Sequence, residues 1–211
     1  MRTRIKVCGI TRLEDALAAA ALGVDALGFV FWPESPRSLS SRQAAAIAAA
    51  LPPFVATVGV FVNQPLDEIL AIAGEVGLGA VQLHGDEPAS MWTRVPGRCL
   101  KAVGVGAGFD AKALAGWPPS VWPLLDAHDP ARRGGTGRAI DWDAAAAAAR
   151  ARRIVLAGGL DPSNIREAIS RVRPSAVDVS SGVERAPGIK DIDRLRAFVE
   201  GVAAADAAQV P

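Results

Sequence analysis

The sequence lacks any uninterrupted apolar stretch of about 18 residues, the length that a membrane-spanning helix needs, so no membrane span is expected. Its basic start, MRTRIKVCGI, is followed by no apolar core with a small-residue cleavage site, so no secretory signal peptide is expected. No charge of one sign predominates, because 23 Lys and Arg residues stand against 22 Asp and Glu residues. This balance argues against nucleic acid and against an anionic membrane as partners.

Cysteine and histidine are scarce as well. Cys8 and Cys99 could form one bridge, but nothing suggests a disulfide framework, and His84 and His128 are too few to suggest a metal cluster. Together with the lack of a signal peptide and of a membrane span, this predicts a protein of a reducing compartment, the cytoplasm.

What the sequence does contain is a regular alternation of two kinds of segment. Half of the residues are hydrophobic, enough for a large core, and 211 residues suit one domain. Short β-branched runs alternate with alanine-rich or amphipathic stretches that are typical of helices. We expect strands at residues 4–8, 25–31, 54–62, 80–84, 98–105, 121–127, 153–159 and 176–182, each followed by a helical segment.

Local signals indicate where several helices begin and end. Thr11 with Glu14 three residues later suggests a capping box, and Gly23 suggests the end of that helix. Ser40 or Ser41 can cap the second helix, and Pro65 stands near the start of the third.

The count and character of the strands favour one fold. The expected strands are nearly continuous apolar runs, as in a parallel sheet that is buried on both faces. Eight strand–helix units with no spare strand predict an α/β protein, a single (β/α)8 TIM barrel that spans residues 1–211. The same alternation is compatible with a doubly wound sheet, but the count of eight favours the barrel.

Chemically capable residues fall at the carboxyl ends of the expected strands, where barrel enzymes have their active sites. Each also has a structural interpretation, since a lone cysteine is more often a small buried hydrophobe and an aspartate can simply cap a loop. Cys99 fits that interpretation, because it begins a strand at the opposite rim. The candidates at the carboxyl rim are Cys8, Arg37, Gln82, His84 and Asp126.

Three small-residue segments suggest a phosphate-binding cup. Loops after the seventh and eighth strands of barrels often bind phosphate through backbone N–H groups and a helix N-terminus. A phosphorylated small molecule is therefore the expected ligand, although glycine in such loops can also serve a tight turn alone. The candidates are Gly158 and Gly159, then Ser180, Ser181 and Gly182, and a third segment with Gly135, Thr136 and Gly137.

The motifs together resemble one known family, the phosphoribosylanthranilate isomerases. The resemblance covers essentially the whole chain and no other barrel family fits the combination. It is carried in chain order by KVCGIT, DALGFVFWPESPRSLS, VGVFVNQP, VQLHGDE, LLDAHDPARRGGTGRAIDW, LAGGLDPSNI and VDVSSGVERAPGIKD.

The resemblance implies an activity and roles. It implies an enzyme of tryptophan biosynthesis that converts N-(5-phosphoribosyl)anthranilate to 1-(2-carboxyphenylamino)-1-deoxyribulose 5-phosphate, an Amadori rearrangement without cofactor or metal. It implies that Cys8 is the general base, that Asp126 is the general acid, and that Arg37 lies near the anthranilate carboxylate. It also implies that loops after the sixth, seventh and eighth strands hold the phosphate.

The rearrangement requires particular surroundings for some of these residues. A free thiol has a pKa near 8.5, so a thiol base needs a group that favours the thiolate: Lys6, a cationic substrate, or backbone dipoles. Lys6 should face the same side of its strand as Cys8, because side chains alternate along a strand. Gln82 and His84 are expected to position substrate, and Gly9 is expected to turn the chain away from it.

Other functions remain in competition. Indole-glycerol-phosphate synthase would need a rim lysine with acidic partners, and the isomerase of histidine biosynthesis, alone or as a bifunctional enzyme, would have an aspartate where Cys8 stands. A different class is a catalytically silent barrel that binds a phosphorylated metabolite or another subunit. The sequence leaves a monomer and a homodimer both open.

Overall fold

The computed structural model describes residues 2–106, 108–127 and 140–209. Eight parallel strands pair in chain order and close on themselves, β8 with β1, which confirms the predicted (β/α)8 barrel over a doubly wound sheet. The strands are β1 (Arg4–Cys8), β2 (Ala26–Val30), β3 (Ala56–Phe61), β4 (Ala80–Leu83), β5 (Arg98–Val105), β6 (Val121–Ala127), β7 (Val155–Leu156) and β8 (Ala176–Val179).

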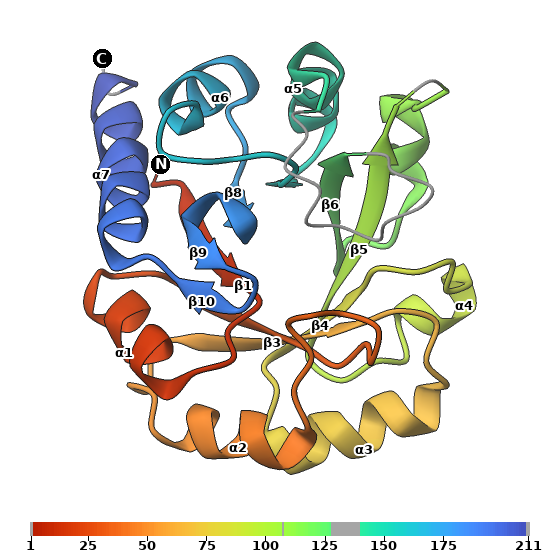
Figure 1. Ribbon diagram of the computed structural model, residues 1–211. Coiled ribbons are helices and arrows are strands. Elements are labelled where there is room, and N and C mark those ends of the chain that lie inside the picture. Colours follow the sequence, from red (N-terminus) through yellow and green to blue (C-terminus); the bar gives the residue numbers. More distant parts are fainter. Residues whose placement is uncertain (1, 107, 128–139, 210–211) are drawn as a thin grey trace.

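Helical segments connect the strands and surround the barrel, as Figure 1 shows. The connection after β5 is a 3₁₀ helix that Asp110 caps. None of the described helices is long and apolar enough to cross a membrane. The helical segments are α1 (Leu13–Ala21), α2 (Ser41–Ala49), α3 (Leu66–Val76), α4 (Ala89–Trp92), η1 (Ala111–Gly116), α5 (Trp142–Ala151), α6 (Ile165–Val172), η2 (Ser181–Val183) and α7 (Ile192–Ala208).

Alternation along the strands separates the core from the barrel interior. In β1, Ile5 and Val7 belong to the main hydrophobic core, whereas Lys6 and Cys8 do not. Cys8 instead packs with Val30 and Val60 in a small cluster. Because neighbouring side chains point to opposite faces, the prediction that Lys6 and Cys8 share a side is confirmed by their common approach to Gly28.

The predicted helix starts and ends are confirmed in part. Ser40 forms the predicted capping box with Gln43, and Gly23 follows the end of α1 with a φ of +81°. The capping box at Thr11 is wrong, since Arg12 is the N-cap of α1 without a side-chain cap. The Thr11 hydroxyl donates instead to the carbonyl of Gly188, at 2.5 Å.

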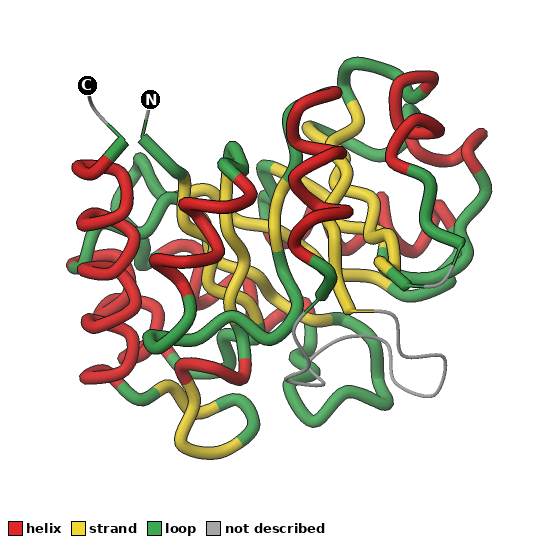
Figure 2. Tube along the Cα trace, turned by 90° about the horizontal axis from the view of Figure 1, so that it is seen from above, coloured by secondary structure: helices red, strands yellow, loops and turns green. Residues whose placement is uncertain are grey.

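A short hairpin after the eighth strand corrects the expectation of no spare strand. It pairs β9 (Glu184–Ala186) with β10 (Ile189–Lys190) in antiparallel fashion, outside the barrel sheet. Figure 2 shows it at the end of the barrel opposite the two chain termini, which lie side by side. The hairpin therefore lies at the rim where the strands end.

Candidate active site

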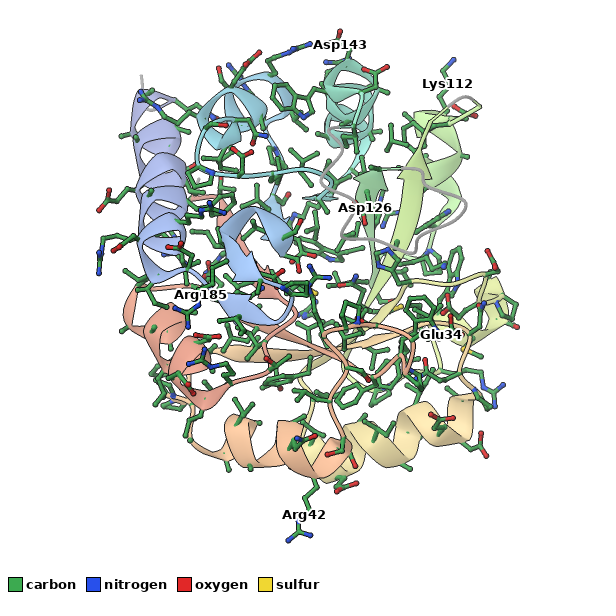
Figure 3. All side chains as sticks on the ribbon, in the orientation of Figure 1. Glu34, Arg42, Lys112, Asp126, Asp143 and Arg185 are labelled. Carbon is green, nitrogen blue, oxygen red and sulfur yellow. The ribbon has the colours of Figure 1, made fainter. Side chains whose placement is uncertain are left out.

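A pocket opens at the carboxyl ends of the strands, where the sequence predicted the site. Figure 3 shows the labelled Asp126 within the ring of helices, whereas Arg42, Lys112 and Asp143 point away from the molecule. Most of the predicted site residues line this pocket: Cys8, Arg37, Gln82, His84, Asp126, Gly158, Gly159, Ser180 and Ser181.

Cys8 ends β1 at the floor of the pocket and is buried. Its register partner in β2 is Gly28, and a β-carbon there would lie 2.9 Å from the Cys8 Sγ and 3.2 Å from the Lys6 Nζ. The missing side chain thus leaves room for the thiol and the ammonium side by side. Burial raises the pKa of the Cys8 thiol above its usual value, although Lys6 and Lys190 act to lower it.

Lys6 lies beneath the pocket rather than in its lining, and it is already paired. Its Nζ donates to both carboxylate oxygens of Asp178, each at 2.8 Å, and both side chains are buried. Burial alone would lower the pKa of Lys6, but the Asp178 carboxylate and the Cys8 thiol outweigh it and raise that pKa. Lys6 is therefore a cation beside the thiol whose charge Asp178 largely balances.

Asp126, near the end of β6, heads a chain of polar side chains across the barrel mouth. Its Oδ2 lies 3.4 Å from the His84 Nε2, and the Gln82 Nε2 lies 2.8 Å from the His84 Nδ1. Since an amide nitrogen only donates, the Nδ1 accepts and a neutral imidazole carries its proton on Nε2, facing Asp126. The buried Gln82 Oε1 has no partner among the described residues.

Arg37 lines the pocket from the loop between β2 and α2 but is bound by a residue that the sequence analysis missed. Its Nε lies 2.9 and 3.1 Å from the two Glu184 carboxylate oxygens, and its Nη2 lies 2.6 Å from one of them. These hydrogen bonds raise the pKa of Arg37. The charge-assisted fork holds the Nε–Nη2 edge of the guanidinium, and within the described residues Nη1 remains available for other contacts.

The pocket has two unlike walls. The apolar wall consists of the side chains of Val30, Trp32, Val60 and Val62. The glycine–serine wall consists of Gly158, Gly159, Ser180 and Ser181, from the ends of β7 and β8. Gly158 and Gly159 have φ values of +79° and +65°, which other residues adopt only with strain.

Some predicted residues lie elsewhere. Gly182 is outside the pocket lining, and a β-carbon there would lie 2.0 Å from the carbonyl oxygen of Leu160. That glycine permits close packing of two loops, so a direct phosphate contact is not supported by its position. The third predicted glycine segment, with Gly135, Thr136 and Gly137, falls outside the described residues.

Asp178 and Lys190 are two further residues of the site that were not predicted from the sequence. Asp178 interrupts the apolar run of β8 and pairs in register with Lys6, so an isolated charge in a buried strand was the available signal. Lys190 is wholly buried and had no local signal of a function. Among the residues that the structure describes, no group of three or more His, Cys, Asp and Glu could hold a metal ion.

The pocket contains the thiol of Cys8 on β1 and the carboxyl group of Asp126 on β6. Next to them it has an arginine fork, an apolar wall, and a wall of backbone and hydroxyl groups. Such a set can move protons on a small ligand that carries an apolar group and anionic groups.

Comparisons with known proteins identify one family that is similar to this chain. Residues 5–201 match the family model described as N-(5′-phosphoribosyl)anthranilate (PRA) isomerase. The N-(5′-phosphoribosyl)anthranilate isomerase of Citrifermentans bemidjiense is 51% identical over 197 residues, which are 93% of this chain and 95% of that protein.

Solved structures extend the similarity to three dimensions. A phosphoribosyl anthranilate isomerase in complex with reduced 1-(o-carboxyphenylamino)-1-deoxyribulose 5-phosphate is 43% identical with a TM-score of 0.85, covering 96% of this chain and 99% of that one. Monomers of dimeric phosphoribosylanthranilate isomerase from Thermotoga maritima, described as mutually generated, are 41% identical, with the same TM-score and coverage. The chain therefore belongs to the family of N-(5′-phosphoribosyl)anthranilate isomerases, enzymes of tryptophan biosynthesis.

Proposed function

We propose that this pocket carries out the isomerisation of N-(5-phosphoribosyl)anthranilate, with Cys8 as general base and Asp126 as general acid. The observation that supports this most directly is the presence of both groups in one pocket, on β1 and β6. We propose a cytoplasmic location as well, because Cys8 and Cys99 are both free thiols, as is usual in reducing compartments.

The proposed steps balance in protons. Asp126, in its protonated form, donates to the ribose ring oxygen, the bond from that oxygen to C1′ breaks, and an iminium cation forms. The thiolate of Cys8 takes the proton from C2′, and the electron pair of that bond neutralises the iminium to give an enamine. In the tautomerisation of the enaminol to the ketone, the Cys8 thiol gives its proton to C1′ and the Asp126 carboxylate takes the proton of the C2′ hydroxyl, which yields the product and regenerates both groups.

Two features support the base role of a buried thiol. Burial keeps Cys8 as a thiol in the free protein, and the Lys6 cation beside it is largely balanced by Asp178. The positive iminium would therefore favour the thiolate at the step that needs it.

The two walls suggest how substrate lies across the mouth. We propose that the anthranilate ring packs on the apolar wall, with its carboxylate on the Nη1 side of Arg37. The phosphate would lie on the glycine–serine wall, which has no cationic side chain among its members and would bind through N–H and hydroxyl groups. We propose that Gln82, which lines the pocket, helps to position the substrate.

The test follows anthranilate fluorescence as purified protein acts on freshly made phosphoribosylanthranilate. Cys8→Ala and Asp126→Asn should each lower kcat by roughly 10²–10⁴-fold with unchanged circular dichroism. Cys99→Ala is the matched control, since Cys99 is equally buried but outside the pocket, and it should keep its turnover. A folded wild type that binds phosphate but turns over nothing would favour a silent barrel.

We propose further that the protein is a homodimer, the alternative to a monomer that the sequence left open. Phe54, in the loop before β3, is 95% exposed, whereas the next large apolar side chain, Leu70, is 44% exposed. Full burial of such a ring stabilises by about 2–3 kcal/mol, so a solvated Phe54 favours contact with a second copy. A dimeric relative exists among the similar structures.

Substitution of Phe54 tests this directly. Phe54→Glu should shift the mass in sedimentation from dimer to monomer and leave kcat near its original value, because Phe54 precedes a strand and the pocket follows the strand ends. Leu70→Glu, on α3, is the control and should leave a dimer. A wild-type protein that sediments as a monomer at micromolar concentration would refute the proposal.

A further inference from the structure

The β9–β10 hairpin brings two buried charges to the rim that the proposed chemistry has not used. The Glu184 side chain is 4% exposed and the Lys190 side chain is 0% exposed. Their Oε1 and Nζ atoms lie 2.8 Å apart. A buried ion pair is costly to form and adds little net stability, so stability alone does not explain this one.

Glu184 holds the Nε–Nη2 edge of the Arg37 guanidinium. Besides the fork described above, its Oε1 accepts from the backbone N–H of Gly188 at 3.3 Å, so the carboxylate is fixed in turn by its own hairpin. The Arg37 side chain passes closely over Gly9, where a β-carbon would lie 2.4 Å from its Cδ. Gly9, with a φ of +74°, therefore admits the arginine to the rim.

Lys190 holds the backbone of the proposed base. Its Nζ donates to the carbonyl oxygen of Cys8 at 2.6 Å and approaches that of Ser180 at 3.5 Å. Its own backbone N–H donates to the Asp15 carboxylate at 3.0 Å, which ties the hairpin to α1. Lys190 thus joins the ends of β1 and β8 to Glu184.

We infer that Glu184 and Lys190 form a clamp that positions two parts of the site at once: the guanidinium of Arg37 and the backbone that carries the Cys8 thiol. The inference rests on the proposed roles of Arg37 and Cys8. Neither clamp residue lines the pocket, so both are positioning residues that act through others. The clamp couples the recognition of an anionic group to the placement of the base.

The clamp also contributes to the charge around Cys8. Lys6 approaches the thiol from β1, Asp178 from β8, Arg37 from the β2–α2 loop and Lys190 from β10. His84 and Asp126 face the same pocket from β4 and β6. Loss of the Lys190 cation should disfavour the thiolate, whereas loss of the Glu184 anion should favour it.

The experiment uses Cys99→Ala protein, so that Cys8 is the remaining thiol, and records alkylation by iodoacetamide against pH without substrate. Lys190→Met should move the alkylation curve to higher pH, and Glu184→Gln should move it to lower pH. In steady-state assays, Glu184→Gln should raise KM by roughly tenfold with a small change in kcat, because Arg37 loses its fixed fork. Lys190→Met should mainly lower kcat.

A second buried ion pair serves as a control that distinguishes a positioning role from a simple loss of stability. Lys101 and Glu87 form another buried pair of 2.8 Å that lies outside the pocket lining. Lys101→Met and Glu87→Gln should lower the unfolding temperature without moving the alkylation curve of Cys8. Glu184→Gln alone leaves the wholly buried Lys190 cation without its carboxylate. The double variant Glu184→Gln/Lys190→Met leaves only Arg37, at the pocket edge, without that partner, so it should fold and should return the curve towards wild type.

The outcomes are distinct. Opposite shifts from the two single variants, with the KM effect confined to Glu184→Gln, support the clamp. Unchanged alkylation curves and an unchanged KM in folded, active variants overturn it. If a single variant does not fold, the KM of the double variant decides, because loss of Glu184 should raise it and an unchanged value overturns the clamp. A wild type without isomerase activity would overturn the proposed function alone, because the alkylation shifts need no substrate.

Discussion

The two walls of the pocket achieve binding in different ways. The apolar wall and Arg37 present side chains, from β2, β3 and the loop after β2, and a neighbouring carboxylate fixes the arginine. The glycine–serine wall presents little side chain, and two of its members have left-handed backbone conformations. Side chains form the surface of one wall, and the conformation of the backbone forms the surface of the other.

This difference predicts a division of labour. A side-chain wall can be changed one contact at a time and should discriminate between aromatic groups. A backbone wall offers N–H groups that any phosphate ester can use, so it should be indifferent to the rest of the ligand. Two probes separate the walls: the reduced product analogue, which has both an aryl group and a phosphate, and ribose 5-phosphate, which lacks the aryl group.

The largest effect is expected from Gly158→Ala, which breaks the backbone wall. A β-carbon at Gly158 would lie 2.6 Å from the Ile140 Cγ2, 2.8 Å from the Ala127 nitrogen and 3.1 Å from the Asp126 Oδ1, at a φ of +79°. Displacement of the wall and of the proposed acid should lower kcat/KM by roughly 10²-fold and weaken both probes. Strain should also lower stability by about 1–3 kcal/mol.

The control for that variant is Gly74→Ala in α3, where nothing lies within 4 Å of the new methyl group. It should leave kinetics unchanged and stabilise the helix slightly, since alanine is the better helix former. If Gly158→Ala keeps wild-type inhibition by ribose 5-phosphate, the glycine–serine wall is not the phosphate site.

Arg37→Lys should have the next largest effect and should act on one probe only. Lysine keeps the charge but loses the planar fork that Glu184 holds, so the carboxylate of the ligand meets a mobile point charge. The inhibition constant of the reduced product analogue should rise roughly tenfold, and that of ribose 5-phosphate should stay the same. Equal loss with both probes would place the phosphate at Arg37 and reverse the assignment of the walls.

What could be read from the sequence follows from how local each signal is. Alternation within one strand was enough to place Cys8 with Lys6 and to bring Gln82 and His84 inside, because the period of a strand fixes its faces. The count of eight units was enough for the barrel, and the rule that sites lie at strand ends was enough to gather the rim residues.

The clamp was not predictable in the same way. Glu184 meets Arg37 across 147 residues of sequence, and Lys190 meets Cys8 across 182. No periodic pattern in the sequence predicts such long-range contacts, and the hairpin that makes them is only a few residues long. The failure at Thr11 has the same cause, since its hydroxyl bonds the Gly188 carbonyl of that hairpin instead of capping α1.

The smallest effect is expected at Trp32, where a substitution shows whether the two walls bind independently. Trp32 is half-buried, lines the pocket and packs against the cluster of Cys8, Val30 and Val60, so one side of its ring is available to a ligand. An aromatic pair adds about 0.5–1.5 kcal/mol beyond simple burial, so Trp32→Leu should weaken the reduced product analogue by roughly three- to tenfold.

The matched control for Trp32 is Trp142→Leu, because Trp142 lies on α5 with the guanidinium carbon of Arg171 5.3 Å from its ring centre, away from the pocket. It should change neither inhibition constant. Ribose 5-phosphate should bind Trp32→Leu as it binds the wild type, since it has no ring to stack. A loss of ribose 5-phosphate binding in Trp32→Leu would mean that the two walls are not independent, and that the apolar wall shapes the whole mouth rather than one end of it.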